Sequence, residues 1–268
     1  MLIQKVRTIK MSKTDESINS DKQTLVQHLT ELRSRLIKSL VLICIVFVIA
    51  YIFAANIYDF LVQPYADAVA GESGRRLIFT ALHETFFTYL KVALFASIFI
   101  SLPFILMQIW IFVAPGLYKN EKSVVIPYFI ATPVLFLLGA ALVYFFIMPL
   151  AIKFFLSFES IGGQGSLPIQ LEAKVNEYLS LIIRLIFAFG ISFQLPVLLT
   201  LLARVSLVSS DGLRNNRKYV IVGVFIIAAI ITPPDPISQI GLGIPILLLY
   251  EISILAVKYI ESKRTKPN

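Results

Sequence analysis

The sequence predicts an all-α, polytopic membrane protein with six transmembrane helices and with both termini in the cytoplasm. Three observations support this fold class. Of the 268 residues, 57% are hydrophobic and only 15% are charged, whereas a soluble domain usually has about 25% charged residues to cover its surface. Several apolar runs reach the roughly 20 residues that an α-helix needs to cross a bilayer. The Lys and Arg residues stand in short blocks between these runs.

The chain begins with a polar, lysine-rich segment over residues 1–24. No apolar core precedes Leu36, so this segment is expected to be a flexible cytoplasmic tail and neither a cleavable signal peptide nor a folded domain. Residues 25–260 form the predicted membrane domain, and residues 261–268 form a second cytoplasmic tail. Within the membrane domain, hydropathy and length predict spans at 36–57, 86–113, 124–149, 179–203, 219–231 and 237–257.

The fifth of these spans is short. Lys218 precedes it and Thr232 followed by two prolines ends it, which leaves about 13 apolar residues, or roughly 20 Å of helix. The hydrocarbon core of a bilayer is about 30 Å thick, so a thinner membrane or a shielding partner protein is expected around this helix. The sixth helix is expected to be short as well.

The orientation follows from the distribution of positive charge, because short cytoplasmic loops carry an excess of Lys and Arg. Eighteen Lys and Arg residues fall on the side of the N-terminal tail, and at most six fall on the opposite side. This asymmetry predicts that both termini are cytoplasmic. It also explains the net charge of +8 without a nucleic-acid partner, since no basic face carries interleaved aromatic residues.

The segment before the first span has the pattern of an amphipathic helix that lies at the membrane interface. Its leucines recur at helical spacing, while Glu31, Arg33 and Arg35 fall on another face. Two interpretations of Glu31 stay open on the pattern alone. The carboxylate could bind a ligand, or it could only pair with Arg35 four residues later, a contact worth a few tenths of a kcal/mol.

A second acidic residue follows the second span. Pro115 and Gly116 end that helix, and the tight cytoplasmic loop after them presents Glu121 among lysines. Taken alone, Glu121 has the pattern of a solvated turn. Its place on the same side of the membrane as Glu31 raises the alternative that the two carboxylates belong to one site.

Together with the further stretches given below, these two segments resemble the TatC family, the large subunit of the twin-arginine protein translocase. The resemblance runs in family order from about residue 22 to residue 260. It rests on the region of Pro64 after the first span and on the following motifs: HLTELR at 28–33, QIWIFVAPGLYKNE at 108–121, AFGISFQLPV at 188–197, LR at 213–214, RKYV at 217–220 and TPPD at 232–235.

The resemblance implies a glove-like bundle of six helices that recognises folded cargo proteins by N-terminal signal peptides with consecutive arginines. In the family, the positions of Glu31 and Glu121 form the receptor site, with Arg33 and Phe112 beside it. A guanidinium matches a carboxylate through two parallel hydrogen bonds, which a lysine cannot reproduce. Each of the two carboxylates could therefore take one arginine of the pair.

The resemblance also marks positions outside the receptor site. Thr232 and Gln239 correspond to the patch at which the single-span partners TatB and TatA dock, and Pro64 and Asp235 correspond to turn positions. Asp235 has simple turn chemistry as its alternative. Gln194 stands where the family often has a glutamate within the fourth span, so a proton relay there is in doubt and an interhelical hydrogen bond is the alternative. Glu251 is expected to pair with Lys258 or to contact a partner.

Two other classes of function were weighed against a translocase receptor. A small-solute transporter or channel needs intramembrane charges or broken helices along a path, and only Arg184 and Glu251 lie deep, in different spans. An intramembrane enzyme needs a catalytic constellation, and His28 and His83 are the only histidines. No cofactor or metal is expected, since the single cysteine, Cys44, lies in an apolar run.

The expected partners are therefore TatA and TatB, twin-arginine signal peptides of folded cargo, the lipid bilayer and further copies of the chain in a receptor complex. The proton-motive force as the driving energy is implied by the resemblance alone, because no nucleotide-binding loop is present. The expected location is the bacterial inner membrane, with an organellar inner membrane of bacterial descent left open.

Overall fold

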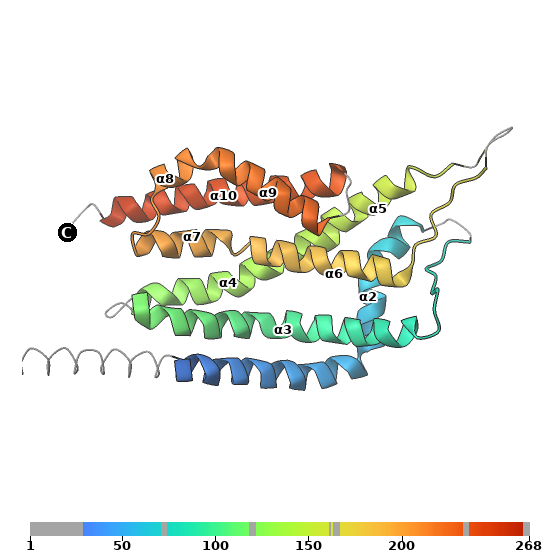
Figure 1. Cartoon of the computed structure of the whole chain (residues 1–268), viewed down its shortest axis with the longest axis horizontal. Coiled ribbons are helices and arrows are strands. Elements are labelled where there is room, and N and C mark those ends of the chain that lie inside the picture. Colours follow the sequence, from blue (N-terminus) through green and yellow to red (C-terminus); the bar gives the residue numbers. More distant parts are fainter. Residues whose placement is uncertain are drawn as a thin grey trace, which may run out of the picture.

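The structure is a computed structural model, and it describes residues 29–70, 74–117, 122–160, 162, 167–232 and 236–264. These residues form helices joined by loops, with two isolated β-bridges and no longer strand among them. Most helices run along one direction (Figure 1), and the first helix begins at the same end at which α10 stops. We call this the inner end, and the end that bears the loops after α2 and α5 the outer end.

The first helix is described from Leu29 to Ile52, and α2 (Ala54–Ala68) follows it directly. Phe53 between them has φ −97° and ψ 14°, outside the helical range. In Figure 1 α2 runs across the outer end of the bundle instead of along it. The expectation of a single span over 36–57 was therefore wrong at its end, because the chain turns at Phe53 and the following apolar residues belong to a helix that does not continue the span.

Pro64 lies inside α2, where it is buried. A proline has no N–H for the carbonyl four residues earlier, which here belongs to Phe60. The hydroxyl of Tyr144 donates to this carbonyl at 2.8 Å, and the two aromatic rings stack with centroids 4.4 Å apart. The hydroxyl of Tyr178 donates to the next carbonyl, that of Leu61, at 2.9 Å. Pro64 is thus not a turn residue. It leaves the carbonyl of Phe60 without its helical N–H donor, and the hydroxyl of Tyr144 from the third span bonds to this carbonyl instead.

The second and third spans are longer than predicted. α3 runs from Glu84 to Leu117. The third span combines α4 (Lys122–Leu142), a π-helical turn η1 (Val143–Ile147) and α5 (Met148–Leu156). The π-helical turn ends two residues before Pro149, which has no N–H to donate to a carbonyl of the preceding turn. The helix therefore passes the proline without ending, and it continues seven residues beyond the predicted boundary.

The fourth span consists of α6 (Val175–Ser192) and α7 (Leu195–Arg204). The two helices are separated at Phe193 and Gln194, just before Pro196, so the predicted continuous helix over 179–203 is interrupted in its middle. Two glycines bring α4 and α6 into close contact. A Cβ atom on Gly190 would lie 2.2 Å from the ring of Phe136, and one on Gly139 would lie 2.8 Å from the carbonyl oxygen of Phe189.

The C-terminal part contains α8 (Ser210–Asn215), α9 (Arg217–Ile231) and α10 (Pro236–Arg264). The short fifth helix is confirmed, since the 15 residues of α9 span about 22 Å. The expectation of a short sixth helix was wrong, because α10 has 29 residues. Within the described ranges, five helical segments are long and apolar enough to cross a membrane, and α9 adds a short sixth one.

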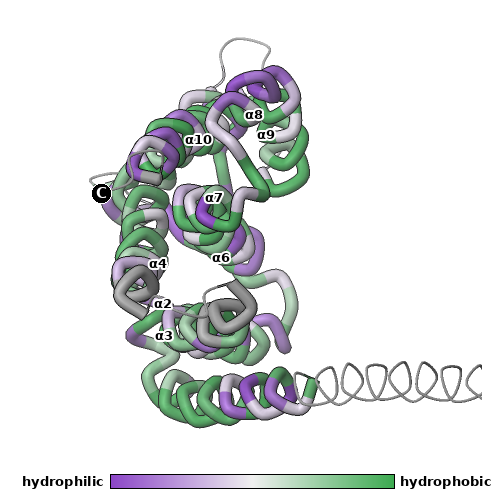
Figure 2. The backbone as a smooth tube through the Cα atoms, turned by 90° about the vertical axis from the view of Figure 1, so that its left-hand side faces the viewer, coloured by the Kyte–Doolittle hydropathy of each residue, from purple (hydrophilic) through white to green (hydrophobic). Residues whose placement is uncertain are grey.

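The helices form an open, curved bundle. Figure 2 looks nearly along the helices and shows the first helix at one edge, α8 and α9 at the other, and α6 and α7 between them. Apolar residues make up most of each spanning helix in this view. Among the described residues the largest fully buried side chains include Phe136, Phe189 and Met148. The main core therefore lies around α6, and the curvature agrees with the glove-like bundle that the sequence resemblance implies.

Candidate functional site

Glu31 lies in the first turn of the described part of the first helix, at the inner end. Its carboxylate accepts two hydrogen bonds from Arg35, at 2.5 Å from Nη2 and 3.1 Å from Nε. The side chain of Glu31 is 41% exposed and that of Arg35 is 19% exposed. The local pair that the sequence left open is thus formed, and the carboxylate still faces solvent on its other side.

Arg35 also joins two helices. Its Nη1 donates to Oε1 of Gln108 on α3 at 3.1 Å, so one guanidinium contacts both Glu31 and the neighbouring helix. Phe112 is half-buried and follows Gln108 by one helical turn, which places both on the same face of α3. Arg33 is exposed and, two residues from Glu31, points away from the pair. The Glu31–Arg35 pair was one of the two interpretations of the sequence, whereas the bond of Arg35 to Gln108 was not predicted, because the two residues are 73 positions apart.

Glu121 and Asp235 lie outside the described residues. The structure does describe both flanks of the loop that contains Glu121, because α3 ends at Leu117 and α4 begins at Lys122. These flanks lie at the inner end, as does the start of the first helix (Figure 1). Glu31, Gln108 and Phe112 are therefore the members of this inner-end region whose positions the structure gives.

Gln194 lies at the break between α6 and α7. Its Nε2 donates to the carbonyl of Thr132 on α4 at 3.0 Å and to that of Gly190 at 3.5 Å. The interhelical hydrogen bond that was the alternative to a proton relay is thus present. The Oε1 atom is buried and has no hydrogen-bond partner within the described part of the chain.

Thr232 and Gln239 both make intramolecular hydrogen bonds near the outer end of α9. Thr232 is buried, and its Oγ1 donates to the carbonyl of Ala228 at 2.9 Å. Gln239 on α10 is half-buried and donates to the carbonyl of Phe225 on α9 at 3.3 Å. The two side chains therefore join α9 to itself and to α10, and Gln239 is the more accessible of the two.

Glu251 does not pair with Lys258, which corrects the sequence expectation. Its Oε2 lies 2.6 Å from Nη2 of Arg217 at the start of α9, and both side chains are about half exposed. The sequence could not place these residues together because they are 34 positions apart. The pair joins α9 and α10, next to a second link in which the hydroxyl of Tyr250 donates to the carbonyl of Leu213 at 2.8 Å.

At the outer end, Arg75 and Glu159 join the loop after α2 to the loop after α5. Two nitrogens of Arg75 donate to the two carboxylate oxygens of Glu159, and the backbone N–H of Leu171 donates to Glu159 at 2.6 Å. The hydrogen bonds from Arg75, followed by that from Leu171, lower the pKa of Glu159 to about 2. Sequence analysis missed this pair, since no local pattern connects residues 84 positions apart.

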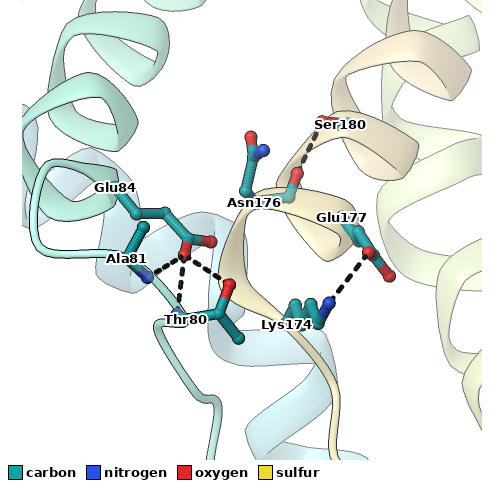
Figure 3. Close-up of polar contacts among 7 residues, drawn as sticks. All are labelled: Thr80, Ala81, Glu84, Lys174, Asn176, Glu177 and Ser180. Carbon is teal, nitrogen blue, oxygen red and sulfur yellow. Dashed lines mark hydrogen bonds and ion pairs between the residues drawn. The ribbon is translucent and has the colours of Figure 1, made fainter.

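The outer ends of α3 and α6 form a second polar cluster (Figure 3). Glu84 begins α3 and accepts hydrogen bonds from the backbone N–H groups of Thr80 at 2.7 Å and Ala81 at 3.3 Å. Such bonds satisfy donors at the start of a helix. On α6, Lys174 lies 3.8 Å from Glu177. The residues of this cluster order the loops that lead into both helices.

These features define the class of the molecule as a multi-pass helical membrane protein with polar groups gathered at the two ends of its bundle. No cluster of His, Cys, Asp and Glu side chains that could hold a metal ion occurs among the described residues. The family model described as Sec-independent protein translocase protein (TatC) matches residues 27–245. The chain therefore belongs to the TatC family.

Individual relatives agree with the family assignment. A relative from Magnetococcus marinus, described as Sec-independent protein translocase protein TatC, is 47% identical over 91% of this chain and 88% of its own length. The relatives from Rickettsia prowazekii and Escherichia coli K12 carry the same description. The Rickettsia relative is 43% identical over 89% of this chain and 94% of its own length. The Escherichia coli relative is 35% identical over 91% of this chain and 91% of its own length.

A solved structure described as "Crystal Structure of Twin Arginine Translocase Receptor- TatC" matches with a TM-score of 0.74. It is 38% identical, and the match covers 87% of this chain and 98% of that one. Family membership assigns the chain to protein translocation and not to an enzyme class. It also gives no support to the small-solute transporter that the sequence alone had left as an alternative.

Proposed function

We propose that this chain is the receptor subunit of a twin-arginine translocase and that its inner end binds signal peptides with two consecutive arginines. One observation carries the proposal. The half-exposed carboxylate of Glu31 already holds a guanidinium, that of Arg35, through two nitrogens. The solved relative that is described as a twin arginine translocase receptor supports the same function.

The geometry suggests how the peptide would be accepted. Arg35 contacts both Glu31 and Gln108, so it would keep its bond to α3 when a peptide arginine takes its place on Glu31. An arginine then replaces an arginine, and the carboxylate is never left unpaired, which limits the cost of exchange. Glu121, on the loop between α3 and α4, would take the second arginine, with Arg33 and Phe112 beside the site.

The outer end of α9 is proposed to dock the single-span partners TatA and TatB. A helix of 15 residues covers about 22 Å of a core that is about 30 Å thick, and a partner helix would shield this mismatch. Gln239 is the side chain best placed to contact the partner, because Thr232 is buried. With these partners the chain would export folded proteins across the bacterial inner membrane at the expense of the proton-motive force.

The receptor proposal is tested by measuring the affinity of the purified chain for a fluorescent twin-arginine peptide. We expect Glu31→Ala and Glu121→Ala each to weaken binding by about 10-fold to 150-fold, the loss of one charge-assisted pair of about 1.5 to 3 kcal/mol. Glu177→Ala removes an exposed carboxylate at the outer end and serves as the matched control. A twin-lysine peptide should bind the unmodified chain weakly.

Equal affinity of the unmodified chain and both inner-end variants would remove these carboxylates from the receptor site. Equal affinity for the arginine and lysine peptides would contradict the forked recognition itself. The thermal stability of each variant is measured in parallel, so that unfolding is not mistaken for loss of binding.

A further inference from the structure

A cavity at the outer end has no role in the proposed receptor function. It has a volume of about 680 Å³ and lies between α5 and α6, reaching Thr232 at the end of α9. In Figure 1 α5 and α6 extend past the outer end of α9, which leaves this part of the two helices uncovered on that side. Phe155 on α5 and Leu181 on α6 are partly exposed and give the cavity an apolar wall, whereas Met148 and Ile152 in its lining are buried.

Arg184 supplies an exposed positive charge to this cavity. It lies nine residues inside the span that begins at Val175. Its Nε donates to the carbonyl of Ser180 at 3.1 Å, one turn nearer the outer end, so the side chain extends toward that end of the bundle. This direction is typical of a long cationic side chain that reaches from a span toward lipid headgroups.

A second cation approaches the same serine. Lys91 on α3 donates from Nζ to the hydroxyl of Ser180 and, at 2.9 Å, to Oδ1 of Asn176. These acceptors are neutral, so the positive charges of Lys91 and Arg184 stay without a paired carboxylate in the described part of the chain.

The carboxylates on the rim of the cavity have other cationic partners. Glu172 lies 3.9 Å from Arg76, and Glu177 lies 3.8 Å from Lys174. The region around Ser180 therefore has an excess of positive charge within an apolar span, which is unfavourable unless an anion reaches it.

The short helix explains how an anion could reach this depth. Because α9 ends at Ile231, the bilayer beside it must thin, which draws the headgroups of the outer leaflet toward the level of Thr232. Arg184 and Thr232 line the same cavity. A guanidinium binds a phosphate through two parallel hydrogen bonds, and a lipid acyl chain would fit the apolar wall.

We propose that this cavity binds one anionic phospholipid, with its phosphate on the guanidinium of Arg184 and an acyl chain along Phe155 and Leu181. The positive charge selects an anionic lipid over a zwitterionic one, and the apolar wall selects a lipid over a soluble phosphate. Since Thr232 closes one side of the cavity, the lipid lies next to the surface at which a partner helix is proposed to dock.

Native mass spectrometry of the purified chain tests the site. The chain is mixed with phosphatidylglycerol, with phosphatidylcholine or with glycerol 3-phosphate, and the bound molecules are counted. We expect one phosphatidylglycerol to be retained preferentially and Arg184→Gln to weaken this binding about tenfold, as expected for one charge-assisted contact. Lys153→Gln removes an exposed outer-end charge that does not line the cavity, and it should leave the binding unchanged.

A photoreactive benzophenone side chain at Leu181 gives a second readout that does not depend on the Arg184 variant. In nanodiscs that contain phosphatidylglycerol it should form adducts with that lipid. The site would be refuted by equal lipid binding of Arg184→Gln and the unmodified chain, by equal binding of glycerol 3-phosphate, or by Leu181 adducts with protein alone. None of these outcomes depends on binding of a signal peptide, so this proposal and the receptor proposal fail separately.

Discussion

The two ends of the bundle are built differently. At the outer end, Arg75 and Glu159 connect two loops through two hydrogen bonds, and Glu84 caps α3 with backbone contacts. At the inner end, Glu31 is 41% exposed, against 19% for Glu159, and its contacts with Arg35 lie within a single helix. The difference suggests that charge at the outer end maintains the shape of the bundle, whereas charge at the inner end stays available for exchange with a ligand.

The largest effect on stability is expected at the junction of the outer loops. Arg75→Ala would leave Glu159, whose side chain is 19% exposed, without its cation, so the melting temperature in detergent should fall more than for Arg76→Ala. Arg76 serves as the control because its contact with Glu172 is long, at 3.9 Å, and exposed. Equal melting temperatures for the two variants would mean that the Arg75 pair contributes no more than a surface contact.

The same pair predicts a dependence on pH. The pKa of Glu159 is lowered from 4.5 to about 2 in the folded chain, so its contribution to stability is complete above pH 4.5 and is lost as the pH falls toward 2. The unmodified chain should therefore lose more thermal stability over this interval than Glu159→Gln, which has no carboxyl group to titrate. Parallel curves for the two proteins would contradict the lowered pKa.

A smaller effect is expected where α2 meets the third span. Tyr144→Phe removes the donor to the carbonyl of Phe60 and keeps the ring stacking, which should cost about 1 kcal/mol of unfolding free energy. Pro64→Ala restores an N–H that can bond to the same carbonyl, so the Tyr144→Phe change should cost less in that background. Additive losses in the double variant would show that Pro64 does not account for the tyrosine contact.

The smallest effect is expected where the start of α9 meets the middle of α10. Glu251→Ala breaks a half-exposed pair with Arg217, and such pairs are usually worth about 0.2 to 1 kcal/mol. We expect a change in melting temperature smaller than that of Arg75→Ala. A larger loss would show that this half-exposed pair contributes more to stability than an ordinary surface contact.

The apolar runs were sufficient to predict the number and order of the spans, because spans are defined by length and hydropathy. The runs could not predict α2, because the apolar residues on both sides of Phe53 read as one continuous segment. The turn depends on backbone angles and on tyrosines from other helices. The interruption before Pro196 was likewise not predicted, because hydropathy alone made 179–203 a continuous helix.

The candidate site was predictable to the extent that its residues lie in local motifs. Glu31 and Phe112 lie at the inner end, as expected from charge asymmetry and motif. Three contacts join residues that lie far apart in the sequence. The separation is 84 positions for Arg75 and Glu159, 34 for Arg217 and Glu251, and 73 for Arg35 and Gln108. Such pairs follow from the packing of the helices and leave no local periodicity, so sequence reasoning could not bring them together.

The break at Phe193 and Gln194 divides the fourth span between two partners. Its outer half, α6, packs against α4, whereas its inner half, α7, packs against α10. The interruption thus lets a single span pack against two different helices, one along each half of its length, with Gln194 bonded to α4 between the two halves.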